Sequence, residues 1–181
     1  RSGHSFPTRR SSDLITIPYV FQNAAVAWSV MDGPFATKLF DGMIAKGFRA
    51  VGVGENGGFR IWGNNVRSIE KPEDMKGLKI RTMQIPAHQE MVKSLGASPT
   101  AVPWMEVYSA LQTGVVDGAN LPTVGSLQQN LHEVLKYITV DNHVYSLSFI
   151  IVSEKWFQSL PDDLQQAVKL AGKIEIGRAH V

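Results

Sequence analysis

The chain has 181 residues, 44% of them apolar, and a formal net charge of +2. This length fits one domain or two small lobes. The absence of cysteine excludes disulfides, thiol catalysis and zinc–thiolate sites, and no apolar run is long enough to span a bilayer.

Both ends of the chain resemble translated sequencing adapters. Residues 1–14 contain H-S-F-P-T-R-R-S-S-D-L, and residues 175–181 contain I-G-R-A-H-V. We exclude such tails from fold reasoning. They hold four of the 18 basic and two of the 16 acidic residues, so the remainder carries no formal net charge. A nucleic-acid partner is therefore not expected, because the basic character of the chain lies in its tails.

Strands alternate with helices along the remaining chain, which favours an α/β fold with mainly parallel sheets. Hydrophobic periodicity, capping residues and glycine stops set the element bounds. The predicted elements are, in order, helix 24–31, helix 34–47, strands 48–53 and 59–62, a small helix in 68–77, strand 78–83, helix 86–95, strand 100–102, helix 104–114, strand 115–116, helix 123–134, strands 137–140 and 144–152, and helix 156–173 with a kink at Pro161.

Two glycine-containing segments are expected to lie outside strands. The E-N-G-G of residues 55–58 predicts a turn or loop. The D-G-A-N-L-P of residues 117–122 predicts a loop after a short strand. Asn120 in that loop either offers its amide to a ligand oxygen or bonds its own backbone as a turn residue.

Arg81 ends the G-L-K-I-R-T-M stretch, in which Leu78 and Ile80 alternate with charged residues as in a half-buried strand. In an open α/β sheet, the carboxyl ends of strands point toward the crevice where ligands bind. A guanidinium matches a carboxylate with two parallel hydrogen bonds. Arg81 is therefore a candidate for binding an acid, and the alternative is a solvated arginine at a strand end.

Further candidate residues lie before and after this strand in the sequence. Arg60 and Arg67 are possible second cations for an acidic ligand, with a surface position as the alternative. Trp104 either walls a ligand pocket or belongs to the core. His88, His132 and His143 show no metal-binding spacing, so we expect structural or surface roles and no metal. Gly52–Gly57 matches G-x-G-x-x-G, but a strand-like segment follows it instead of a helix, so no dinucleotide cofactor is expected.

Five segments together resemble the solute-binding proteins of TRAP-type transporters, the dicarboxylate-binding class. The resemblance covers essentially all of residues 15–173, whereas family members are considerably longer, so we expect an internal fragment. The segments are K-P-E-D-M-K-G-L-K-I-R, S-L-G-A-S-P-T, M-E-V-Y-S-A-L-Q-T-G-V-V-D-G, E-V-L-K-Y-I-T and L-P-D-D-L-Q-Q-A-V.

The resemblance implies a periplasmic receptor without enzymatic activity. It implies an incomplete, periplasmic-binding-protein-like fold of two α/β lobes that close on a small organic acid and deliver it to the membrane subunits of a TRAP transporter. The expected division is part of lobe one in 15–58, lobe two in 59–143, and a return to lobe one in 144–174.

The resemblance also assigns ligand-binding roles to single residues. Arg81 falls on the family's signature arginine, which pairs with the ligand carboxylate, and Arg60 aligns with a second arginine of several members. Trp104 falls where an aromatic side chain packs on the ligand, and Gln84 where a polar side chain approaches it. Leu121 occupies the position of the family's usual asparagine, while Asn120 lies one residue earlier. This departure indicates either a less polar ligand or a shifted loop in which Asn120 substitutes.

Two other functions remain open from the residues themselves. An effector-binding domain of a transcription regulator shares the two-lobed architecture, and it requires a DNA-binding helix-turn-helix elsewhere in the protein. An α/β enzyme acting on a small acid requires either a nucleophile with a general base or a group of metal ligands. No residues of these kinds occur at a spacing that indicates a catalytic site.

Overall fold

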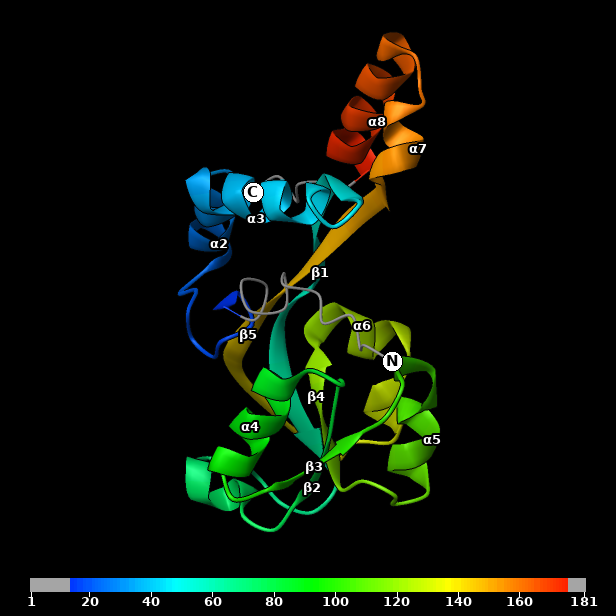
Figure 1. The fold of residues 1–181 in the computed structure, drawn as a ribbon. Helices are drawn as coiled ribbons and strands as arrows, with labels where there is room; N and C mark the ends of the chain where they lie inside the picture. Colours follow the sequence, from blue (N-terminus) through cyan, green and yellow to red (C-terminus); the bar gives the residue numbers. More distant parts are fainter. Residues whose placement is uncertain (1–13, 176–181) are drawn as a thin grey trace, which may run out of the picture. The chain divides into compact units, whose positions relative to one another are not determined.

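The computed structural model describes residues 14–175, with side chains up to Gly172, and divides the chain into two compact units (Figure 1). Unit 1 contains Phe21–Asn56, the chain from Leu147 onward and the described residues up to Ile15. Unit 2 contains Thr16–Val20 and Gly57–Ser146. The two adapter-like tails lie outside the described residues except for Leu14 and Glu175.

Two of the predicted helices open unit 1. Helix α2 (Ala24–Met31) begins after Asn23, whose side chain accepts a hydrogen bond from the Val26 amide. Helix α3 (Pro34–Ile44) begins at a proline, which suits a first helical turn because its missing amide proton has no helical partner there. Both helices confirm the sequence prediction.

The predicted turn at E-N-G-G is wrong, because one long strand, β1 (Phe48–Asn64), runs through it. Gly57 and Gly58 both have positive φ, near 76°, so they supply the left-handed conformation without ending the strand. The boundary between the two units falls at this point of β1. In the same way, β5 (Tyr137–Ser153) joins the two strands predicted near the carboxyl end.

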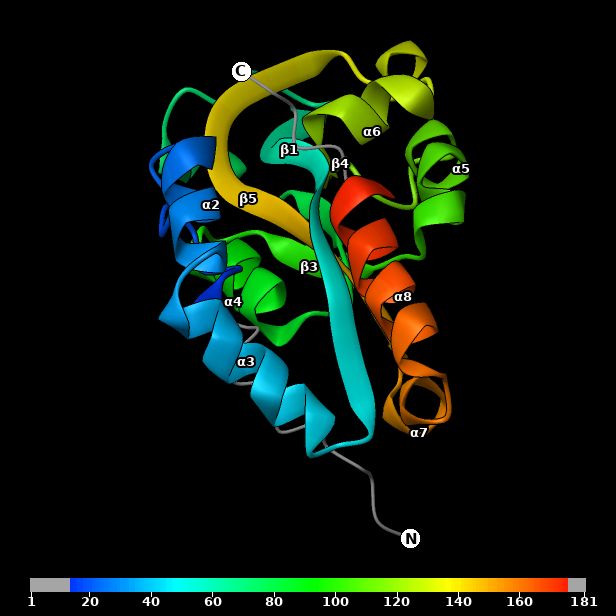
Figure 2. The same ribbon diagram turned by 90° about the horizontal axis from the view of Figure 1, so that it is seen from above.

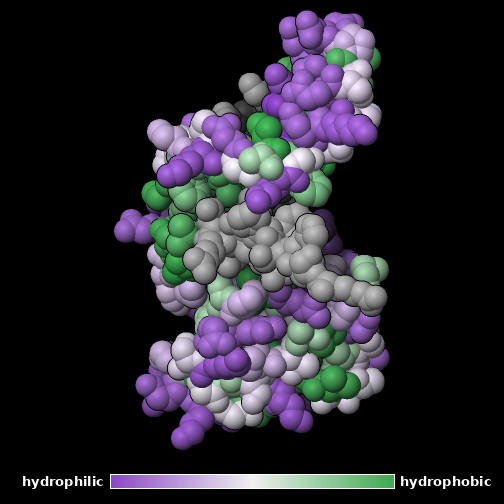
Figure 3. Space-filling model, in the orientation of Figure 1, coloured by the Kyte–Doolittle hydropathy of each residue, from purple (hydrophilic) through white to green (hydrophobic). Residues whose placement is uncertain are grey.

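Helices cover the unit 1 parts of β1 and β5. In Figure 2 the first part of β1 runs between α3 and α8 (Asp162–Glu175). Gly172 of α8 lies so close to β1 that an added Cβ would come within 2.2 Å of the Val51 oxygen. Helix α7 (Glu154–Gln158) precedes α8, with Pro161 between them as predicted. The visible face of α8 is largely hydrophilic (Figure 3).

The sheet has the strand order β3-β2-β4-β1-β5. Strands β3 (Ser98–Ala101) and β4 (Gly118–Pro122) both pair in parallel with β2 (Lys79–Thr82), whereas β1 pairs antiparallel with β4. The α/β class is confirmed, with a mixed sheet that is parallel at β3-β2-β4.

The predicted D-G-A-N-L-P loop is wrong, because its last five residues form the fully buried β4. Pairing on both edges overrides the turn preference of Asp-Gly.

Alternating residues of β1 point to two different cores of unit 2. Ile61 packs with Val107 and Leu111 of α5 (Val107–Gln112). Trp62 packs with Ile80 of β2 and with Val92 of α4 (Pro86–Ser94). The remaining elements are the short helices η1 (Pro72–Met75), η2 (Trp104–Glu106), α6 (Thr123–Gln128) and η3 (Leu131–Glu133).

Candidate functional site

Arg81 lies one residue before the end of β2 and is only 2% exposed. Its Nε donates a hydrogen bond of 2.9 Å to the Val102 oxygen. Within residues 14–175 no other nitrogen of this guanidinium has a hydrogen-bond partner, and Nη1 is buried. The strand thus holds the base of the guanidinium in place and leaves its two terminal nitrogens available.

Arg60, on β1, is also 2% exposed and is held by neutral partners. Its Nε donates to Oδ1 of Asn120, and its Nη2 donates to the Asn120 backbone oxygen at 3.1 Å. Its Nη1 donates to Oγ of Ser146 at 3.1 Å. The antiparallel pairing of Arg60 with Pro122 and of Trp62 with Asn120 brings these side chains together.

The two arginines share a buried region that contains no counter-charge. Among the described residues, neither guanidinium forms an ion pair with a carboxylate. Burial lowers the pKa of Arg60 to about 9, with a further contribution from the charge of Arg81. Burial alone lowers the pKa of Arg81 to about 10. Both remain cations at neutral pH, so the folded protein carries two buried positive charges that an external anion would stabilise.

Further buried polar atoms without partners belong to the same part of unit 2. Arg60 holds the amide oxygen of Asn120, so Nδ2 of Asn120 faces away as a donor, and no described residue accepts a hydrogen bond from it. Both ring nitrogens of His88 are buried, as is Oγ1 of Thr82, and none of these atoms has a hydrogen-bond partner within residues 14–175. Buried polar atoms in native proteins nearly always have a partner, so such a group of unpaired atoms points to a binding site.

Three other candidates from the sequence differ in how deeply they are buried. Trp104, in η2, is half-buried, and its ring centroid is 5.5 Å from Cζ of Arg81, within cation–π range. Gln84 lies in the short loop after β2 and is exposed. Arg67 is exposed too, and it donates to the backbone oxygens of Asp74 and Lys76, which is a structural role.

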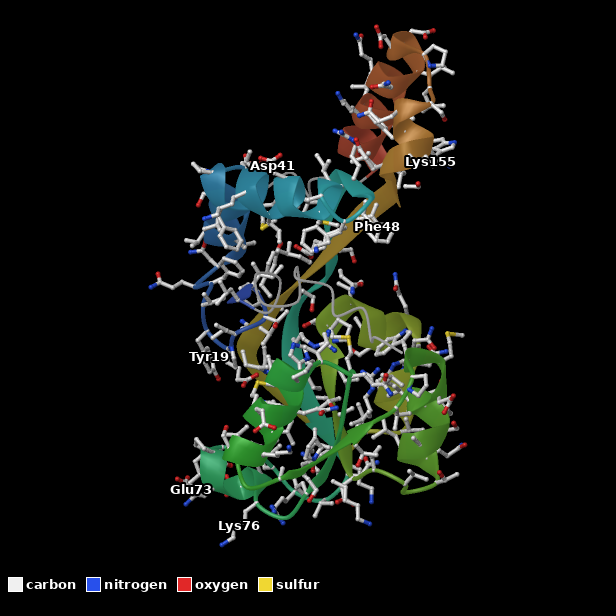
Figure 4. All side chains as sticks on the ribbon, viewed as in Figure 1. Tyr19, Asp41, Phe48, Glu73, Lys76 and Lys155 are labelled. Carbon is white, nitrogen blue, oxygen red and sulfur yellow. The ribbon has the colours of Figure 1, made fainter. Side chains whose placement is uncertain are left out.

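A hydrogen-bonded network around Asp141 positions His143. Oδ1 of Asp141 pairs with Nδ1 of His143 at 2.7 Å, and Oδ2 accepts from Tyr19 and from Nε1 of Trp62. The His143 ring stacks on Trp62 at 4.2 Å. Tyr19, labelled in Figure 4, and this network border a cavity of about 370 Å³ between η1, α4 and β5. Nε2 of His143 is buried and has no hydrogen-bond partner in the described part of the chain.

Comparisons with known proteins show the family to which the chain belongs. The family model for bacterial extracellular solute-binding protein, family 7 (DctP), matches residues 6–174. The chain belongs to this family.

Relatives with known sequences and structures cover most of the chain. A solute-binding protein of Verminephrobacter eiseniae is 37% identical over 93% of this chain and 50% of its own length. A TRAP periplasmic solute-binding protein of Sulfitobacter sp. NAS-14.1, solved with bound β-D-galacturonate, has a TM-score of 0.89 and 31% identity over 93% of this chain and 56% of that one. A TRAP protein of Sulfurospirillum deleyianum, solved with bound succinate, has a TM-score of 0.85 and 34% identity over 92% and 54%. The chain spans about half the length of the curated relatives it matches.

In this member of family 7, the structure brings together four of the five predicted ligand-binding residues, namely Arg81, Trp104, Arg60 and Asn120. Arg81 contacts Trp104, and Arg60 contacts Asn120, while the charge of Arg81 acts on Arg60. Gln84 is exposed on the following loop. Their ligand-binding roles stay predictions.

Sequence reasoning missed His88 and Ser146. Ser146 lies 86 residues from its partner Arg60, and no local pattern indicates such a contact. His88 carried one available signal, since it lies four residues before the apolar Val92 on the same helical face. That spacing indicates burial, and a buried histidine raises the question of its hydrogen-bond partners.

Proposed function

We propose that the protein is an extracytoplasmic solute receptor that binds the carboxylate of a small organic acid. The observation that carries this proposal is the buried pair Arg60 and Arg81, for which the described part of the chain supplies no carboxylate partner. The terminal nitrogens of Arg81 suit a carboxylate that accepts two parallel hydrogen bonds. Trp104 beside this guanidinium supplies an apolar wall for the rest of the ligand.

The bound ligands of similar proteins support the same chemistry. β-D-galacturonate and succinate each carry a carboxylate, and they occupy two proteins that are 31% and 34% identical to this chain. The chain spans about half the length of its relatives, so the binding of such an acid by this protein is proposed and is not taken over from them.

We further propose the cellular role that family 7 membership suggests. Units 1 and 2 would be parts of the two lobes of a periplasmic receptor that passes its acid to the membrane subunits of a TRAP transporter. No helix within residues 14–175 is long and apolar enough to cross a bilayer. Binding would occur without turnover, and NMR spectra of the acid before and after incubation test that point.

A binding experiment tests the function. It uses the longest natural protein that contains this sequence, called here the full-length protein. A thermal-shift screen against mono- and dicarboxylates identifies an acid, and calorimetry then measures its affinity. Arg81→Lys keeps the charge but loses the planar fork, so we expect an affinity about 10- to 100-fold weaker.

Arg67→Lys makes the same change at an exposed arginine and serves as the control. We expect it to bind the acid as tightly as the unmodified protein. Equal affinities for the unmodified protein and for Arg81→Lys would remove Arg81 from the carboxylate-binding role.

A further inference from the structure

His88 is a buried polar side chain that no internal contact explains. It lies in the first turn of α4, is 1% exposed, and neither ring nitrogen has a hydrogen-bond partner among the described residues. A histidine that serves only the core normally bonds a neighbouring group.

The chain connectivity places His88 beside the arginines. Only three residues separate the end of β2 at Thr82 from the start of α4 at Pro86. The first turn of α4 therefore lies at the carboxyl end of β2, where Arg81 lies. Val92, one turn further along the helix, packs on Ile80, which fixes the buried face of α4 toward the sheet.

The imidazole of His88 is neutral in this setting. Burial lowers the pKa of His88 to about 3, with smaller contributions from Arg60, His143 and Arg81. A neutral imidazole offers one N–H donor and one bare nitrogen that accepts. Protonation would add another cation to a buried region that already holds two.

A carboxylate cannot satisfy both nitrogens of this ring. An ionised carboxylate only accepts hydrogen bonds, so it can pair with the N–H but leaves the bare nitrogen unpaired. A hydroxyl both donates and accepts, and it can therefore bind either nitrogen. Asn120 adds a free amide donor to the same region, which suits a second ligand oxygen.

We propose that His88 recognises a ligand hydroxyl and that the site selects hydroxylated carboxylic acids over their deoxy counterparts. This inference rests on the proposed function, because Arg81 must first hold the carboxylate. It assigns His88 the role of a specificity-determining residue.

Matched pairs of acids in calorimetry with the full-length protein test this role. Malate is compared with succinate, and erythronate with butyrate, because the members of each pair differ in their hydroxyl groups. We expect the hydroxylated member of at least one pair to bind about 10-fold or more tightly than its deoxy partner.

Variants of His88 then assign the preference to this residue. His88→Phe keeps a planar ring without polar atoms, and we expect it to weaken the hydroxylated acid about 10- to 100-fold and the deoxy acid less than about 3-fold. His88→Gln keeps a donor and an acceptor and should restore part of the preference. His132→Phe, the same change at an exposed histidine, should leave both affinities unchanged.

The outcomes separate this inference from the function on which it rests. Equal weakening of both acids by His88→Phe, or no hydroxyl preference in the unmodified protein, overturns the role of His88 while the receptor function stands. A full-length protein that binds none of the acids, or that binds them equally well after Arg81→Lys, overturns the carboxylate site and the inference with it.

Discussion

Partly buried Arg49 of unit 1 and the fully buried Arg60 and Arg81 of unit 2 differ in how their charge is balanced. In unit 1, Arg49 donates two hydrogen bonds of 2.7 Å to Glu154 and lies 4.5 Å from the centre of the Phe157 ring. In unit 2, Arg60 and Arg81 have no carboxylate partner among the described residues. Hydrogen bonds to Glu154 raise the pKa of Arg49, whereas burial lowers the pKa of Arg60 and Arg81. An arginine that finds its acid within the chain supports the fold, and one that does not can bind an acid from outside.

The largest effect is expected when the unpaired cation of unit 2 is removed. Arg81→Met should weaken acid binding by about 2–5 kcal/mol, because the ligand carboxylate loses its charged partner. The unliganded protein should gain about 1–3 kcal/mol of stability, because an uncompensated buried charge is replaced by an apolar side chain. Calorimetry measures the first quantity and urea unfolding the second.

Lys79→Met removes an exposed cation from the same strand and is the control for this change. Neither the affinity nor the unfolding free energy should move by more than about 0.5 kcal/mol. A less stable unliganded Arg81→Met protein would mean that this arginine supports the fold as Arg49 does.

Acid should destabilise unit 2 through His88. The unfolded histidine binds a proton below about pH 6.5, whereas His88 in the folded protein stays neutral down to about pH 3. The unfolded state thus binds more protons in this window. This contribution to stability is fully present above pH 6.5 and is lost as the pH falls toward 3, up to about 4 kcal/mol.

Urea unfolding between about pH 7 and pH 4 measures this dependence. Other groups also titrate in this range, so the informative quantity is the difference between the unmodified protein and His88→Phe. The variant should lose less stability on acidification, and His132→Phe should follow the unmodified protein. Parallel pH curves for all three proteins would show that His88 is not held neutral.

A smaller effect is expected when unit 2 receives its own carboxylate. Asn120→Asp places an acid on Arg60 and reproduces the arrangement of Arg49 with Glu154. We expect acid binding to weaken by about 1–3 kcal/mol, because the internal carboxylate neutralises the cation that attracts the ligand. Calorimetry measures the change in acid binding. Tighter acid binding by this variant would contradict the comparison.

The smallest effect is expected in unit 1. Arg49→Met removes the cation paired with Glu154, which keeps its hydrogen bond from Gln158, so the melting temperature should fall by a few degrees. The affinity for the acid should not change, because Arg49 takes no part in the proposed site. A loss of affinity without a loss of stability would show that the two classes of arginine are not distinct.

Local patterns predicted much of the fold. The alternation around Ile80 predicted a strand that β2 matches, and the apolar face from Phe35 to Ile44 predicted α3. These patterns succeed because side-chain periodicity and capping depend on residues a few positions apart. Local patterns were wrong for the E-N-G-G and D-G-A-N-L-P segments. Their glycines are typical of turns, yet residues 55–58 lie within β1 and residues 118–122 form β4.

The candidate site was only partly accessible to the same reasoning. Arg81 was identified from its place at a strand end, and Arg60 and Trp104 were candidates from the residues around them. The family resemblance added Gln84. The resemblance left the role of Asn120 open, because Leu121 takes the usual asparagine position. The structure shows Asn120 bonded to Arg60 within β4 and Leu121 in the apolar core.

The sequence by itself determined that a cation would lie near the end of a short strand, because strand alternation and residue type are local properties. It also determined the family, through five ordered segments. Only the tertiary structure decided which arginines find a carboxylate. Arg49 meets Glu154 across 105 residues of chain, and Arg60 meets a neutral asparagine across 60, so the balance of charge in each unit depends on strand pairing and helix packing that no short stretch of sequence contains.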